Sequence, residues 1–154
     1  MKKSHLILVL ILLLGCKSDE ATIEKIGYES IGLQCLFKED TQYIITSEEA
    51  YIQMARQIYD HRFGHDCADT TKAPFDFGKF VLIGKYTSLD ENDQKSLTVI
   101  QNNIQQRLLY KMTVTRVPGP TGGGFGNFYS SGMNWVKVAK PPAGYAILID
   151  FTEN

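Results

Sequence analysis

Residues 95–117 read KSLTVIQNNIQQRLLYKMTVTRV, and the structure of this stretch decides whether the chain is mainly helical or mainly β. Five apolar residues recur at helical spacing: Leu97, Ile100, Ile104, Leu108 and Met112. The second half also alternates between apolar and polar residues and is rich in β-branched residues, and Asn102-Asn103 favours a hairpin turn. We therefore predict two strands, over residues 96–101 and 105–117.

The segments on either side add further strands and one helix. Strand patterns cover residues 31–37, 43–46, 77–86, 135–139 and 145–151, separated by polar or Gly/Pro-rich segments. Ser47 is a typical N-cap, and an apolar helical stripe runs from Ala50 to Tyr59, so a helix is expected to end near Asp60. The prediction is an α+β fold, a mainly antiparallel β sheet with one principal helix, in a single β-rich domain over residues 30–154.

The N-terminus has the pattern of a secretion signal. Lys2 and Lys3 precede a nine-residue apolar run, residues 6–14, which as a helix would rise only about 14 Å against a hydrocarbon core of about 30 Å. The run ends Leu13-Leu14-Gly15-Cys16, which resembles the lipobox of bacterial lipoproteins. The resemblance implies a signal peptide over residues 1–15 that is cleaved after Gly15. It also implies acyl chains on Cys16, palmitate among them, and a lipidated tether over residues 16–29.

The residues after Cys16 concern the final location. In lipoproteins of this kind an Asp directly after the Cys often retains the protein at the inner membrane, and here Lys17 stands in that place. We therefore expect an outer-membrane location. Asp19-Glu20 resembles a short surface-export tag and is equally typical of a solvated tether, so both the periplasmic and the surface-exposed face stay open.

Composition limits the partners. Without residues 1–15 the chain has 139 residues and a formal charge of −3, with no basic cluster, which argues against nucleic acid. The expected partners are the membrane, through the lipid on Cys16, and an unidentified envelope protein. Cys35 and Cys67 are expected to form a disulfide in an oxidising compartment, with two free thiols as the alternative. A loop of 33 residues closed in this way contributes about 3.5–4 kcal/mol in the chain-entropy model.

Two segments contain candidate site residues. His61, His65 and Cys67 offer metal-ligand chemistry, but Gly64 weakens a shared helical face, and an exposed polar loop is the favoured interpretation, so no metal or other cofactor is expected. The glycine-rich segment 118–126 lacks the Lys of a phosphate loop, and both a flexible β–β loop and an interaction loop stay open as interpretations. Its candidate residues are Pro120, Thr121, Gly122, Gly123 and Phe125. Trp135 is assigned to the core. No nucleophile stands beside a base, so no catalytic residue is assigned and the chain is not expected to be an enzyme.

Several short motifs resemble known groups. Residues 75–84 (FDFGKFVLIG) and 134–138 (NWVKV) resemble segments of small uncharacterised envelope lipoproteins. Residues 120–123 (PTGG) are similar to a loop in the C-terminal domain of a spirochaete-type protease-complex subunit, although Gly124 replaces its Tyr. The same loop resembles those of chagasin-type cysteine-protease inhibitors. These resemblances imply a non-enzymatic binding or accessory module. Protease inhibition through segment 118–126 is the alternative, and a metal-dependent enzyme at His61 and His65 comes third.

Overall fold

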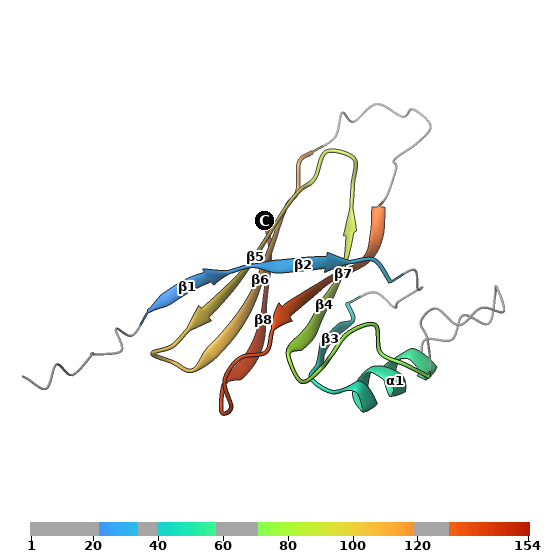
Figure 1. Cartoon of the computed structure of the whole chain (residues 1–154). Helices are drawn as coiled ribbons and strands as arrows, with labels where there is room; N and C mark the ends of the chain where they lie inside the picture. The colour runs from blue at the N-terminus through green and yellow to red at the C-terminus, as the bar shows by residue number, and fades with distance from the viewer. Residues whose placement is uncertain (1–21, 34–39, 58–70, 119–129) are drawn as a thin grey trace, which may run out of the picture.

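The computed structural model describes residues 22–33, 40–57, 71–118 and 130–154, which form two four-stranded sheets and one helix (Figure 1). The elements are β1 (Ile23–Ile26), β2 (Tyr28–Ile31), β3 (Gln42–Ile45), α1 (Glu48–Gln57), β4 (Phe80–Leu89), β5 (Gln94–Asn102), β6 (Arg107–Thr115), β7 (Ser130–Ala139) and β8 (Ala146–Glu153). The strand orders are β1-β5-β6-β8 and β2-β7-β4-β3. All strand pairs are antiparallel except β6·β8, so the predicted, mainly antiparallel architecture with one helix is confirmed.

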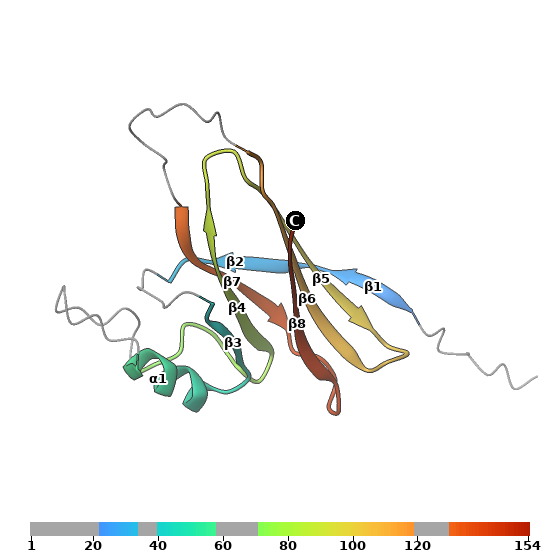
Figure 2. The same cartoon turned by 180° about the vertical axis from the view of Figure 1, so that it is seen from behind.

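The elements stack in three layers, with α1 on the outer side of the β2-β7-β4-β3 sheet (Figures 1 and 2). Because strand side chains alternate between faces, this sheet contributes to two cores. The inter-sheet core consists of Val81, Ile83, Val99, Leu108, Tyr110, Met112, Val136 and Val138. The helix-side core consists of Ile45, Tyr51, Met54, Ala55, Ala73, Phe77, Leu82 and Trp135. Burial of both faces explains why residues 81–85 of β4 are buried without interruption.

The hairpin predicted within residues 95–117 is confirmed. β5 and β6 pair from Gln94↔Thr115 to Asn102↔Arg107. The Asn102 Oδ1 atom accepts a hydrogen bond from the Gln105 amide at 2.9 Å, and Gln106 takes a positive φ of 50° to complete the turn. Residues 94–115 therefore form paired strands, although their apolar residues also recur at helical spacing.

The tether predicted over residues 16–29 is too long. Residues 23–26 and 28–31 form β1 and β2, which belong to different sheets and are joined at Gly27. β1 pairs with β5 and β2 with β7, so a nearly continuous strand crosses from one sheet to the other and closes one side of the sandwich (Figure 1). Most side chains here are exposed although half of the strand residues are apolar, so main-chain pairing, more than burial, holds both strands in the sheets.

The helix begins as predicted, and β4 begins later. The Ser47 Oγ atom accepts the amide of Ala50 at 3.1 Å, as an N-cap should. The strand predicted from residue 77 starts at Phe80, because Asp76 forms a turn in which its carbonyl accepts the amides of Lys79 and Phe80, both at 3.1 Å. No helix among the described residues is long and apolar enough to cross a membrane.

The two ends of the sandwich differ in character. We call one the entry end; it contains Thr22, the β5–β6 turn at residues 103–106 and the β7–β8 turn at 140–145. We call the other the clamp end; it contains the β4–β5 turn at residues 90–93, Arg116 and Asn154. The nine residues of β5 run from one end to the other, about 27 Å at 3.4 Å per residue.

Candidate binding site

The inter-sheet layer changes from apolar to polar towards the clamp end. On β4, Val81 and Ile83 are followed on the same face by Lys85 and Thr87, both buried. The neighbouring strand β7 shows the same change from apolar to polar residues, because Asn134 is the register partner of Lys85. Buried polar groups are normally hydrogen-bonded, so the partners of Lys85, Thr87 and Asn134 define the polar part of the inter-sheet layer.

Asn134 joins the two sheets. Its Nδ2 atom donates to the Thr87 Oγ1 atom at 2.8 Å and to the Lys85 carbonyl at 3.2 Å. Its Oδ1 atom accepts from the Nζ atom of Lys95 on β5, in the opposite sheet. Its carbonyl accepts the Tyr110 hydroxyl at 3.0 Å. Burial keeps the pKa of Tyr110 well above its usual value, and nearby Tyr28 acts in the same direction, so this hydroxyl remains a donor.

A cleft of about 420 Å³ opens beside Asn134, between β5 of one sheet and β2 and β7 of the other. This volume is in the range of small-ligand and side-chain pockets. Polar residues that line it include Lys95, Asn134 and Ser30, and apolar ones include Leu97 and Met133. Tyr28, 41% exposed, forms part of the wall and donates its hydroxyl to the Leu97 carbonyl at 3.3 Å.

Lys85 occupies the other side of this polar layer. Its side chain is 9% exposed, its Nζ atom lies 5.0 Å from the centre of the Phe151 ring, and it donates to the Asp40 carbonyl at 3.3 Å. The Asp40 carboxylate is fully exposed and 4.0 Å away, so it adds little stabilisation. A smaller cavity of about 120 Å³ lies next to Phe151 and Thr87 and reaches Arg116.

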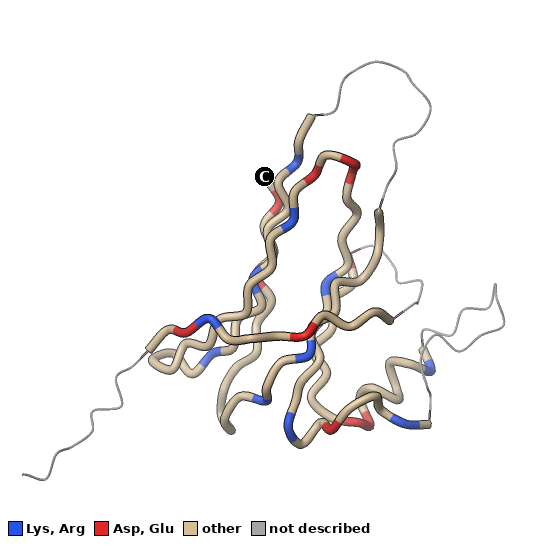
Figure 3. Tube along the Cα trace, turned by 45° about the horizontal axis from the view of Figure 1, so that its top comes forward, with Lys and Arg blue, Asp and Glu red and all other residues tan. Residues whose placement is uncertain are grey.

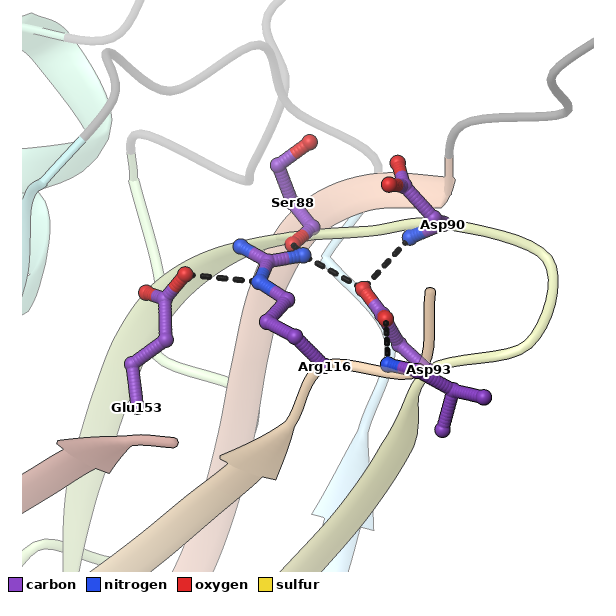
Figure 4. Close-up of polar contacts among 6 residues, drawn as sticks. Ser88, Asp90, Asp93, Arg116 and Glu153 are labelled. Carbon is purple, nitrogen blue, oxygen red and sulfur yellow. Dashed lines mark hydrogen bonds and ion pairs between the residues drawn. The ribbon is translucent and has the colours of Figure 1, made fainter. Parts of the chain in front are cut away.

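Arg116 holds the clamp end together (Figure 4). Its guanidinium forms an ion pair with Asp93, donates through Nε to Glu153 at 2.6 Å and through Nη1 to the Ser88 carbonyl at 2.9 Å. It therefore joins the ends of β4, β6 and β8 to the β4–β5 turn. Hydrogen bonds to Glu153 and Asp93 raise the pKa of Arg116 above its usual value.

Asp93 extends the clamp to the main chain. One carboxylate oxygen accepts the Asp90 amide at 2.8 Å, and the other accepts the Val117 amide at 3.1 Å. These amides and Arg116 hold the pKa of Asp93 below its usual value. Acidic positions also mark the β4–β5 turn in Figure 3, and Asp90 and Glu91 are exposed there. Val117 directly precedes the predicted interaction segment 118–126, so Asp93 holds the main chain at the residue before that segment.

The residues predicted from sequence to act in a site lie outside the described residues. These are Cys16, Cys35, Cys67, His61, His65, Pro120, Thr121, Gly122, Gly123 and Phe125. Trp135 does lie in the core, 2% exposed and stacked on Tyr43 with ring centres 5.6 Å apart, as predicted.

Sequence reasoning missed two pairs of residues that the fold brings together. They are Asn134 of β7 with Lys95 of β5, and Asp93 of the β4–β5 turn with Arg116 at the end of β6. The available signals were a polar Asn beside Trp135 in an apolar strand and an Arg ending an alternating strand. Neither signal indicates which residue Asn134 or Arg116 contacts in the folded chain.

Within the described residues, no three His, Cys, Asp or Glu side chains gather in a way that could hold a metal ion. Comparison of the chain with protein-family models, characterised proteins and solved structures finds no match. The cleft beside Asn134 and the clamp around Arg116 are therefore the features of the molecule that bear on its function.

Proposed function

We propose that the chain is a lipid-anchored protein of the bacterial cell envelope and that its domain is a non-enzymatic module that binds another envelope protein. The observation that supports binding is the inter-sheet cleft of about 420 Å³ beside Asn134. Lys95 and Ser30 supply hydrogen-bonding groups, and Leu97 supplies an apolar surface. This combination suits an amphipathic side chain or a short extended segment of a protein.

Site-specific photo-cross-linking in native membranes tests the proposal. A photoreactive aromatic residue replaces Tyr28 in the cleft, and the matched control carries it at Ile44 on β3, because both side chains are 41% exposed. We expect one discrete protein adduct from position 28, abolished by Lys95→Glu, and none from position 44. No adduct at position 28, or the same adduct at both positions regardless of Lys95, would contradict the proposal.

A second candidate function is protease inhibition through segment 118–126. The observation that favours it is the Asp93 carboxylate, which fixes the Val117 amide at the base of that segment. The test is inhibition of papain-like proteases by the complete protein and by a variant lacking residues 121–124. Inhibition that disappears with the deletion would support this function, and unchanged or absent inhibition would eliminate it.

A further inference from the structure

We propose that the entry end of the sandwich is a membrane-contacting surface, with Ile23 and Ile104 in the headgroup region of the bilayer that holds the acyl chains of Cys16. This inference depends on the proposed lipid anchor and adds an orientation to it. Its partner is a lipid surface.

The two most exposed large hydrophobic side chains among the described residues lie at this end. Ile23 is 64% exposed and Ile104 is 61% exposed, whereas the other four, Tyr28, Ile44, Val117 and Leu148, range from 38% to 41%. Ile23 is the register partner of Asn102, two residues before Ile104 at the β5–β6 turn. Turns are usually formed by Gly, Pro, Asn, Asp or Ser, so neither turn formation nor burial in the core explains an exposed Ile at this position.

The apolar surface continues from Ile23 onto the outer face of the β1-β5-β6-β8 sheet. Ile100, Leu109 and Leu148 form one row across three strands, with Lys25 at its β1 end. Arg107 is exposed in the adjacent row, beside Asn102. The acidic group on β1, Glu24, accepts the Thr22 hydroxyl at 2.9 Å. Apolar side chains flanked by cations are typical of surfaces that enter the membrane interface.

The chain enters the domain at this same surface. The Thr22 carbonyl accepts the Asn103 amide at 3.1 Å, and the Thr22 hydroxyl accepts the Asn103 Nδ2 atom at 3.2 Å, so the start of the chain is fastened to the β5–β6 turn. Only six residue steps separate Cys16 from Thr22, and these span at most about 22 Å even when fully extended. The lipid therefore holds the turn that bears Ile104 close to the bilayer.

This orientation also explains the location of the cleft. β5 carries Lys95 near the clamp end, while Asn102 lies at the entry end, and the strand extends about 27 Å between them. With Ile23 and Ile104 in the membrane, the clamp end faces away from the lipid. The cleft is then open to a protein partner.

Tryptophan depth measurements test the surface. The complete acylated protein is placed in vesicles of phosphatidylethanolamine and phosphatidylglycerol, with and without brominated acyl chains. Ile104→Trp and Ile23→Trp report on the entry end, and Val117→Trp is the control at the clamp end, an exposed hydrophobic position (38%). Trp135 gives a common background that the parent protein measures. We expect blue-shifted emission that brominated lipid quenches for positions 104 and 23, and neither effect for position 117.

Intact mass of each sample separates the two ways of failing. An acylated protein whose positions 104 and 23 are unquenched, or quenched no more than position 117, would overturn the membrane-contacting surface and leave the lipid anchor standing. A sample recovered from native membranes without acyl mass would overturn both the anchor and the surface.

Discussion

The Asp93 carboxylate forms an ion pair with the Arg116 guanidinium while its own side chain is 1% exposed and that of Arg116 is 36% exposed. The pair is therefore unlike the surface ion pairs of the same chain, such as Lys111–Asp150, whose side chains are 49% and 43% exposed at 3.8 Å. A covered carboxylate depends on its partners, because removing them leaves polar groups without hydrogen bonds.

Asp93→Asn should lower the urea midpoint of unfolding. The amide cannot form the ion pair with Arg116, and its NH₂ group cannot accept one of the two main-chain hydrogen bonds that the carboxylate oxygens accept from Asp90 and Val117. Asp150→Asn is the matched control, because it removes an exposed ion pair by the same chemical change. Equal midpoints for the two variants would show that the clamp contributes nothing special to stability.

The effect of Asp93→Asn should depend on pH. Because the pKa of Asp93 is lower in the folded state than its ordinary value of 3.8, its contribution is complete above that value and is lost as the pH falls through the folded pKa. The stability difference between parent and variant should therefore be constant near neutral pH and shrink in acid below about pH 4. Urea titrations at several pH values measure it, and a difference that grows on acidification would refute the assignment.

Tyr110→Phe should destabilise the fold by about 1–3 kcal/mol, because it leaves the Asn134 carbonyl without its donor in the inter-sheet layer. Tyr28→Phe is the control, since that hydroxyl belongs to a side chain that is 41% exposed and water can replace it. Chemical denaturation of both variants compares them. A larger loss of unfolding free energy for Tyr28→Phe would contradict this expectation, because the exposed hydroxyl in the cleft would then stabilise the fold more than the buried one.

Gly84→Ala should cost about 1–3 kcal/mol through overpacking. A Cβ atom at Gly84 would clash with the Trp135 ring, lying 2.6 Å from its Cζ3 atom, and would lie 2.8 Å from the Cε atom of Met133. The control is Gly132→Ala in the neighbouring strand β7, where a Cβ atom meets nothing within 4 Å, and its effect should stay within about 0.5 kcal/mol. Thermal unfolding of the two variants decides whether close packing of Trp135 on β4 stabilises the helix-side core.

Periodicity and turn chemistry predicted most of the fold. The Asn102-Asn103 turn, the Ser47 cap and the apolar centre of β4 are local signals, and each leads to the observed element. β1 and β2 were missed because each is only four residues long and most of their side chains are exposed, and pairing with β5 and β7 is a long-range effect. The parallel pairing of β6 with β8 is likewise a property of the assembled sheet.

The candidate site was harder to predict than the fold. Asn134 and Lys95 are 39 positions apart, and Arg116 and Asp93 are 23 apart. A single polar residue in a strand has many possible partners until the register is known. The sequence motifs around His65 and Gly122 lie outside the described residues, so the metal-ligand and interaction-loop hypotheses for them stay predictions.

Acylation of Cys16 is the premise of both the proposed envelope location and the proposed orientation at the membrane. The decisive measurement is the intact mass of the protein recovered from native membranes and alkylated before and after reduction. We expect a species that begins at Cys16 and carries acyl mass, with Cys35 and Cys67 alkylated only after reduction. A species without acyl mass whose two thiols react at once would contradict the anchor and the disulfide together.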